Sequence, residues 1–318
     1  MLNEPCLLVI VGATAVGKTA LAIALAQKFQ APILSADSRQ VYRYFDIGTA
    51  KPSLTERAGV PHYLIDLVEP DYNFTLAEYQ QQAQQLIASF HCRGVSPILV
   101  GGTGLYIKSV VSGLQIPQVA PQPELRRQLS ELGQSYCYQL LQQIDRPSST
   151  KIHPHDAVRT LRALEVFYVT GTTLSALQSS HTPTYPILQI GITSPSRPSY
   201  LQIIEKRIRQ MLKQGWLDEI QFIQANYGKS LPLLRTIGYA EMTDYLAGKS
   251  SLDTAIARAT TSTYQFAKRQ RTWFKSDRRI IWVNPITARY NLNDLFDLVH
   301  NRENWQVHTD DDATHHAP

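Results

Sequence analysis

A glycine-rich run close to the N-terminus contains the residue types that hold a diphosphate. It consists of Gly12, Ala13, Thr14, Ala15, Val16, Gly17, Lys18 and Thr19, and it matches the pattern G-x-x-x-x-G-K-[ST]. In such a loop the glycines let successive backbone N–H groups turn toward an anion, the lysine adds a positive charge, and the threonine hydroxyl can ligate Mg²⁺. A match of this kind arises by chance in roughly one chain of this length in a hundred. We therefore interpret residues 12–19 as a phosphate-binding loop, although the pattern does not identify the diphosphate compound.

The segments on either side of this loop must position it. Residues 7–11 form an unbroken apolar run, which is typical of a buried parallel strand. The Ala/Leu-rich segment at residues 19–29 predicts a helix. The motif thus lies between a strand and a helix, which is the context that a phosphate-binding loop requires.

Polar residues follow two further predicted strands. The apolar run 31–36 ends at Asp37-Ser38-Arg39-Gln40, and the run 97–100 ends at a GGTG turn that contains Thr103. In an open parallel sheet, ligands bind beyond the carboxyl ends of the strands, so we expect Asp37 and Thr103 to face the same crevice as the phosphate loop. Asp37 could act there as a general base or as a second-shell metal ligand; the alternative is an aspartate that caps a following helix. The GGTG turn is by itself as often a close-packing device as a ligand loop.

The order of these elements predicts an α/β fold with a doubly wound, mostly parallel sheet. Residues 116–123 contain three prolines, residues 124–179 have a helical pattern, and a strand-like run returns at 187–192. We therefore expect an all-helical domain inserted into the core. The predicted domains are residues 1–115 (first part of the core), 116–186 (helical insertion), 187–302 (second part of the core, with basic helices) and 303–318 (disordered tail).

Composition narrows the class of protein. The 318 residues are 43% hydrophobic and 18% charged, and no apolar run reaches the length of a membrane span. The N-terminus lacks a secretory pattern. Three cysteines that are widely spaced, with no CxxC pair, argue for a reducing compartment and against structural zinc. We expect a cytoplasmic protein that does not act at a membrane.

The distribution of charge points to a polyanionic partner. The net charge is +5, and residues 197–279 contain fifteen Lys/Arg against seven Asp/Glu. Within the predicted helix 253–274 and just after it, Lys268 and Arg271 alternate with aromatic residues in KRQRTWFK, a pattern that suits RNA backbone contact and base stacking. Nucleic acid, and tRNA in particular, is the leading candidate partner. The alternatives are solvated helix faces without a partner and a cationic helix end favoured by the helix dipole.

A second group of arginines lies in the predicted insertion. Arg159 and Arg162 are three residues apart, so they share one helix face and could grip a phosphate or diphosphate. The alternative is a surface pair with Asp156 and Glu165. On the opposite face, Leu161, Leu164 and Phe167 are the predicted buried residues.

With these residues in view, the chain resembles the tRNA dimethylallyltransferase family, whose members are also called tRNA isopentenyltransferases. The similarity runs from about residue 7 to residue 283. The matching blocks are GATAVGKT, LSADSRQVYRYFDIGTAKP, PHYLID, VGGTGLYIKS, PELR, KIHPHDAVRTLRALEV, IEKRIRQML, LRTIGYAE and FAKRQRTWF. A phosphate loop is generic, but the DS-x-QVYR-x-x-DIGTAKP block and the HP-x-D-x-x-R-x-x-RALEV helix are specific.

The resemblance implies a prenyl transfer. Family members bind dimethylallyl diphosphate, not ATP, in the loop with Mg²⁺, and they transfer the prenyl group to N6 of the adenosine 3′ to the tRNA anticodon. Asp37 then looks like the general base, Thr103 a residue at the reacting atoms and Thr19 the metal ligand. The implied diphosphate-binding residues are 12–19 and Arg207. The implied tRNA-binding residues are Asp37, Ser38, Arg39, Gln40, Thr103, Arg126, Arg159, Arg162, Lys268 and Arg271. The implied partner is the anticodon stem-loop, and we expect a monomer.

Some positions depart from the family pattern, and other functions remain to be compared. Arg39 replaces the usual Met and adds a charge beside the target base, and Val158 and Thr160 replace the usual Gln and Leu beside Arg159. The alternatives are an adenylate isopentenyltransferase acting on free AMP, ADP or ATP, a P-loop small-molecule kinase, and a GTPase-like RNA-binding switch. The helical insertion favours tRNA over free nucleotide, and no NKxD motif supports the switch.

Overall fold

The computed structural model describes residues 5–178, 182–284, 299 and 301. The chain divides into two compact units, one of residues 1–107 and 184–318 and one of residues 108–183. The sequence pattern places these boundaries after residues 115 and 186, slightly later than the structure does. The predicted disordered tail, 303–318, lies outside the described residues.

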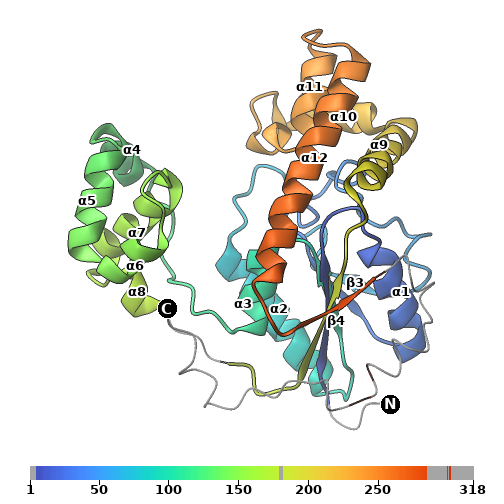
Figure 1. The fold of residues 1–318 in the computed structure, drawn as a ribbon, viewed down its shortest axis with the longest axis horizontal. Helices are drawn as coiled ribbons and strands as arrows, with labels where there is room; N and C mark the ends of the chain where they lie inside the picture. Colours follow the sequence, from blue (N-terminus) through green and yellow to red (C-terminus); the bar gives the residue numbers. More distant parts are fainter. Residues whose placement is uncertain (1–4, 179–181, 285–298, 300, 302–318) are drawn as a thin grey trace. The chain divides into compact units, whose positions relative to one another are not determined.

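The first unit is built on a six-stranded sheet with the order β3-β2-β4-β1-β5-β6 (Figure 1). The strands are β1 (Leu7–Gly12), β2 (Ile33–Ala36), β3 (His62–Tyr63), β4 (Ile98–Gly101), β5 (Ile187–Ile192) and β6 (Ile280–Val283). All pairings are parallel. Every residue of β1, β2, β4 and β5 is buried, as expected for a parallel sheet that is covered on both faces. The predicted α/β class with a parallel sheet is confirmed.

Helices cover this sheet and extend from it. The first unit contains α1 (Lys18–Phe29), α2 (Leu76–His91), α9 (Arg197–Lys213), α10 (Trp216–Tyr227), α11 (Tyr239–Leu246) and α12 (Leu252–Lys275), and α3 (Gly104–Val111) begins in it. The long helix α12 packs against α9 and α11, and its C-terminal part reaches the sheet at β1 (Figure 1). Residues far apart in the sequence therefore meet at the carboxyl end of β1.

The backbone explains three local features of this unit. The strand β3 is only two residues long, and Leu64 and Asp66 just after it have positive φ angles of 63° and 53°. Residues 232–246 form a 3₁₀ turn, Pro232–Arg235, and the separate helix α11, because Gly238 between them has a φ of 86°. Turns rather than a helix follow Asp37, so this residue does not cap a helix.

The second unit is helical and has a core of its own. Its helices are α4 (Pro123–Glu131), α5 (Gln134–Ile144), α6 (Arg146–Lys151), α7 (Ala157–Thr170) and α8 (Leu174–Leu177). Leu129, Cys137, Leu141, Ile152, Ala163 and Leu164 form the buried cluster. Of the predicted buried face of α7, only Leu164 is fully buried, while Leu161 and Phe167 are half-buried. Thr160, Ala163, Glu165 and Val166 are buried instead.

Candidate active site

The phosphate loop connects β1 directly to α1. Gly17 caps α1 with a φ of 94°, and Ala15 also has a positive φ of 61°, so the chain makes a sharp turn before the helix begins at Lys18. The first turn of α1 contains no acidic residue. The positive end of the helix dipole is therefore not compensated locally, which favours an anion at this place.

Two cations converge on the loop. The Lys18 ammonium donates a hydrogen bond of 2.7 Å to the Ala13 carbonyl. Burial and, to a lesser extent, the Arg207 guanidinium lower the pKa of Lys18, and Asp37 opposes them; together they bring it to about 8. Burial also lowers the pKa of Arg207, which extends from α9, and Asp37 again opposes it. In the part of the chain that the structure describes, neither cation forms a salt bridge. The loop thus has an excess of positive charge.

Asp37 and Thr103 lie at the ends of the neighbouring strands β2 and β4. The Asp37 carboxylate accepts a hydrogen bond of 2.8 Å from the Arg39 N–H, which fixes its side chain. The Thr103 hydroxyl accepts a hydrogen bond of 3.0 Å from the Ser38 N–H, and the Thr103 N–H donates to the Ala36 carbonyl at 3.1 Å. The two strand ends are therefore joined at the residues predicted to do chemistry.

The Gln40 side chain forms hydrogen bonds with other groups of the protein. Its carbonyl oxygen accepts from the Ser35 hydroxyl at 3.0 Å, and its amide nitrogen donates to the carbonyls of Thr49 and Ala50, both at 3.3 Å. The sequence pattern predicts that Gln40 contacts the substrate base. In this structure its amide holds the 45–51 loop against the end of β2.

Two charged residues that the sequence reasoning missed fix the same loop. The Glu219 carboxylate, on α10, accepts hydrogen bonds from the backbone N–H groups of Asp46, Ile47 and Gly48 and from the Tyr239 hydroxyl. The Lys51 ammonium is buried and donates to the Tyr42 carbonyl and to the carboxylates of Asp46 and Asp66. An acidic residue in the first turn of a helix and a lysine in a loop give no signal of these pairings.

Two other residues missed from the sequence hold the phosphate loop from outside. The Thr14 N–H donates to the Gln270 side-chain oxygen at 2.8 Å, and the Thr14 carbonyl accepts from the Tyr200 hydroxyl at 2.5 Å. Both backbone groups of Thr14 are thus used within the protein. Of the nine residues predicted to bind the diphosphate, Thr14 therefore contributes to the shape of the loop.

The remaining candidates in the first unit are on its surface. Thr19 is exposed in the first turn of α1, and Arg39 is exposed beside Asp37. On α12, Lys268 and Arg269 are exposed, Arg271 is half-buried, and Trp273 is 39% exposed. The Arg269 guanidinium lies 5.9 Å from the centroid of the Phe266 ring. This end of α12 presents both positive charge and aromatic surface.

The arginines of the second unit differ in accessibility. Arg126 forms two hydrogen bonds with the fully buried Glu165 carboxylate, and Arg162 donates to Glu165 and to the Val119 carbonyl. Burial opposes ionisation of Glu165, but the bonds from Arg126, the Gln122 N–H and Arg162 lower its pKa to about 2. Arg159 has a side chain that is 62% exposed and lies 3.4 Å from Asp156. Of the three predicted tRNA-binding arginines in the second unit, Arg159 is therefore the most accessible.

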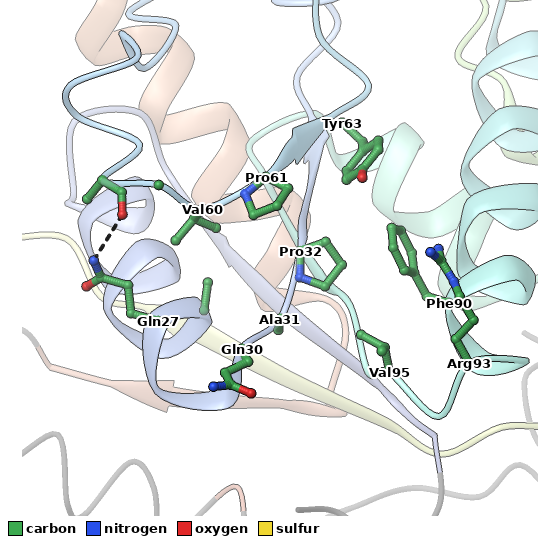
Figure 2. Close-up of a pocket in the computed structure, with 13 residues that line it drawn as sticks. Gln27, Gln30, Ala31, Pro32, Val60, Pro61, Tyr63, Phe90, Arg93 and Val95 are labelled. Carbon is green, nitrogen blue, oxygen red and sulfur yellow. Dashed lines mark hydrogen bonds between the residues drawn. The ribbon is translucent and has the colours of Figure 1, made fainter.

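A hollow of about 510 Å³ lies elsewhere on the first unit (Figure 2). Ala31 and Pro32 precede β2 and Val95 precedes β4, so the hollow is at the amino ends of the strands, opposite to the phosphate loop. Its lining is mostly apolar, and its charged residue, Arg93, lies over the Phe90 ring at 4.7 Å. None of the predicted site residues lines it. Chemistry at the carboxyl ends of the strands is thus separate from this hollow.

Comparisons with known proteins identify the family of this chain. The sequence profile of a family described as "IPP transferase" matches residues 40–277. A tRNA dimethylallyltransferase of Acaryochloris marina is 56% identical over 295 residues, which are 93% of this chain and 96% of the relative. One of Microcystis aeruginosa is 58% identical over 279 residues, 87% of each chain. Within the described residues, no helix is both long and apolar enough to cross a membrane.

Solved structures show the same similarity. A tRNA isopentenylpyrophosphate transferase of Bacillus halodurans superimposes with a TM-score of 0.68 at 34% identity, over 94% of this chain and 95% of that chain. A eukaryotic dimethylallyltransferase, described as acting on tRNA, superimposes with a TM-score of 0.77 at 28% identity, over 96% of this chain and 82% of that chain. Because the family profile covers most of the chain and the relatives match nearly their full length, this chain belongs to the IPP transferase family.

Proposed function

We propose that this protein is a tRNA dimethylallyltransferase. It transfers a dimethylallyl group from dimethylallyl diphosphate to N6 of the adenosine 3′ to the tRNA anticodon and releases diphosphate. The observation that carries the proposal is a phosphate loop with two cations, Lys18 and Arg207, that form no salt bridge with any described residue and lie near the carboxylate of Asp37. Relatives that are 56% identical bear the corresponding name.

The chemistry explains why the cations matter. An adenine amino group is a weak nucleophile, because its lone pair is delocalised into the ring, so the prenyl carbon must be made strongly electrophilic. The bond between that carbon and the diphosphate oxygen breaks, and a bond from N6 to the carbon forms. Lys18, Arg207 and the N–H groups at the start of α1 stabilise the charge that develops on the departing diphosphate, the type of interaction that usually contributes most to catalysis. Asp37 accepts the proton that leaves N6.

Thr103 and its neighbours orient the acceptor. The hydrogen bond from the Ser38 N–H to the Thr103 hydroxyl fixes the ends of β2 and β4 relative to each other. The target base must leave its stack to reach these residues, and Ser38 and Arg39 border the place that it would enter. Gln40 supports this segment from behind through its bonds to the 45–51 loop.

We also propose that Mg²⁺ is the cofactor. The residues present fit it: the exposed Thr19 hydroxyl follows Lys18 at the start of α1, as the loop pattern requires. Among the described residues, no group of three or more His, Cys, Asp or Glu side chains could hold a metal ion. Mg²⁺ commonly binds through few protein ligands and the phosphates of a substrate, so Thr19 and the diphosphate suffice. When bound, Mg²⁺ neutralises charge on the diphosphate.

For the RNA, we propose that the anticodon stem-loop contacts the exposed or half-buried cations of α12 and of α7. Lys268 and Arg271 near the end of α12 and Arg159 at the start of α7 are accessible to a phosphate backbone. We propose that the helical unit, residues 108–183, is the tRNA-binding insertion. The phosphate loop, Asp37, Thr103 and Arg207 all belong to the first unit of one chain, so we expect a monomer to be active. Its tRNA substrate places its work in the cytoplasm.

A transfer assay tests the function and its nearest alternative. Radiolabelled dimethylallyl diphosphate and Mg²⁺ are incubated with the protein and an unmodified tRNA transcript, and in parallel with AMP. We expect label on the tRNA, lost when the adenosine 3′ to the anticodon is replaced by guanosine. Label on AMP and none on tRNA would assign the protein to free-nucleotide prenylation. ATP hydrolysis without prenyl transfer would mean that the loop binds another ligand.

A further inference from the structure

One buried side chain, that of Gln270, forms hydrogen bonds with both glycine-rich turns of the site. Gln270, on the inner face of α12, is 8% exposed. Its carbonyl oxygen accepts from the Thr14 N–H at 2.8 Å, and its amide nitrogen donates to the Gly102 carbonyl at 2.9 Å. The first bond reaches the phosphate loop, which follows β1. The second reaches the GGTG turn, which follows β4.

The packing around this amide is tight on the side of the GGTG turn. A Cβ atom at Gly102 would collide with the Gln270 amide nitrogen, and one at Gly104 would collide with the Trp273 ring, which is one turn further along α12. Residues of α12 thus lie directly against the backbone of residues 102–104. The absence of side chains at the two glycines lets Gln270 reach the carbonyl.

The chemical type of the side chain matters. The Thr14 N–H requires an acceptor and the Gly102 carbonyl requires a donor, at the same time and a few ångströms apart. A primary amide supplies both, whereas an ionised carboxylate only accepts and an ammonium only donates. Both bonds lie in a region where an unpaired polar group would be costly.

The two hydrogen bonds of Gln270 link the loop assigned to the leaving diphosphate with the turn beside the acceptor residues. Thr14 belongs to the loop that binds the diphosphate. Gly102 precedes Thr103, whose hydroxyl accepts from the Ser38 N–H next to Asp37. We propose that Gln270 is a positioning residue that sets the spacing between the phosphate loop and the Thr103–Asp37 pair, and so places the prenyl carbon within reach of the adenosine amine. This inference rests on the proposed function. A misplacement of about 1 Å can cost about a hundredfold in rate, so the contribution is large although Gln270 touches no substrate.

The substitution Gln270→Glu tests this role with almost no change of shape. At pH 8 the carboxylate cannot donate to the Gly102 carbonyl, and we expect kcat for tRNA prenylation to fall about a hundredfold. The KM for dimethylallyl diphosphate and the Kd for tRNA should stay within about threefold of wild type. The protonated form of this carboxyl both donates and accepts, so it can restore both hydrogen bonds. The ratio of variant to wild-type kcat should therefore rise as the pH falls from 8 to 6.

Control variants separate positioning from other effects. Gln265→Glu makes the same change at an exposed position of α12 and should leave kcat unchanged at every pH. Gln270→Met removes both bonds without adding a charge, so its kcat should be low and should follow the wild-type pH profile. If Gln270→Glu does not fold, the kcat of Gln270→Met alone tests the positioning role of Gln270.

The outcomes distinguish this inference from the function on which it rests. Wild-type kcat in Gln270→Met, or a raised KM for dimethylallyl diphosphate with unchanged kcat, would overturn the positioning role. Absence of transfer by both the wild type and Gln265→Glu would count against the proposed function instead. In that case hydrogen exchange decides: the Thr14 amide should exchange at least tenfold faster in Gln270→Met than in wild type, and equal exchange would overturn the inference.

Discussion

Two clusters of basic side chains differ in whether a carboxylate pairs with the cations. In the helical unit, Arg126 and Arg162 both bind the buried Glu165, which also accepts the Gln122 N–H. At the phosphate loop, burial and the Arg207 guanidinium lower the pKa of Lys18, burial lowers the pKa of Arg207, and Asp37 is a nearby carboxylate that acts only through space. We call Arg126, Arg162 and Glu165 the closed cluster, because both cations pair with a carboxylate. We call Lys18, Arg207 and Asp37 the open cluster, because neither cation forms a salt bridge with a described residue.

This difference separates a structural cluster from a binding site. A buried carboxylate with several charge-assisted hydrogen bonds is satisfied, and breaking it costs stability. Like charges held together without a partner are unfavourable in the absence of ligand, and such arrangements occur where a ligand supplies the opposite charge. The pKa values support this distinction. The pKa of Glu165 is lowered to about 2, so its charged form is favoured, whereas the pKa of Lys18 is lowered to about 8, so its charged form is disfavoured. An arginine pair in a helix is therefore not by itself evidence of a phosphate site.

The largest effect is expected at the carboxylate of the open cluster. Asp37→Asn keeps the shape of the side chain but removes the proton acceptor, so the rate of prenyl transfer should fall by about 10²–10⁴-fold. The Kd for tRNA, measured by filter binding, should change less than threefold. A variant that no longer binds tRNA would show that Asp37 holds the structure rather than accepting a proton.

The open cluster should also respond to removal of one cation. Arg207→Ala loses a charge-assisted contact to the diphosphate, worth about 1.5–3 kcal/mol, so the KM for dimethylallyl diphosphate should rise about 10–100-fold. The matched control is Arg209→Ala on the same helix, because Arg209 is half-exposed and pairs with Glu205 at 2.8 Å. Equal effects of the two substitutions would contradict an open cation at Arg207.

In the closed cluster, the expected effect is on stability. Glu165→Gln leaves two arginines without their carboxylate and should lower the free energy of unfolding by about 3 kcal/mol, measured by urea denaturation. Glu124→Gln, at an exposed pair with Arg127, is the control and should change it by less than about 1 kcal/mol.

The closed cluster also predicts a dependence on pH. Because folding lowers the pKa of Glu165 from 4.5 to about 2, its contribution is complete above pH 4.5 and is lost as the pH falls toward 2. The difference in stability between wild type and Glu165→Gln should therefore shrink across this range. A difference that is constant from pH 6 to pH 3 would contradict the assignment.

The smallest effect is expected at the exposed arginine of the helical unit. Arg159→Ala should weaken tRNA binding about 2–10-fold and reduce the slope of log Kd against log salt by about 1, as for one phosphate contact. Its surface pair with Asp156 contributes little, so the melting temperature should hardly change. A large loss of stability with unchanged tRNA affinity would place Arg159 with the closed cluster.

Local pattern and sheet topology explain how much of the site could be predicted from the sequence. The phosphate loop has its own motif, and Asp37 and Thr103 follow short apolar runs, a pattern that favours buried parallel strands. Because such strands end at one edge of a sheet, the three segments had to meet there. The family resemblance added roles to these positions.

The residues that hold the site together could not be predicted in this way. Gln270 bonds Thr14 across 256 positions of the chain, and Glu219 bonds Ile47 across 172. Both side chains bind backbone groups, so no complementary residue type marks the partner. A pair between Arg162 and Glu165 was the alternative that the sequence left open, but neither the burial of Glu165 nor its bond with Arg126 could be predicted from the spacing.

The most direct test that the open cluster binds a diphosphate is a measurement of proton uptake on ligand binding. Burial and the nearby Arg207 lower the pKa of Lys18 to about 8, so part of the Lys18 side chains is neutral at pH 8. A bound diphosphate favours the charged form. Titration calorimetry with dimethylallyl diphosphate, in two buffers of different ionisation enthalpy, should therefore show proton uptake at pH 8 that is smaller or reversed at pH 6.5, where Lys18 is already charged and the diphosphate itself can release a proton.

The substitution Lys18→Arg provides the matched measurement, because an arginine keeps its charge at both pH values. This variant should bind the diphosphate without proton uptake. Absence of uptake by the wild type at pH 8, or the same uptake by Lys18→Arg, would contradict the account of Lys18 and Arg207 as cations that await the prenyl donor.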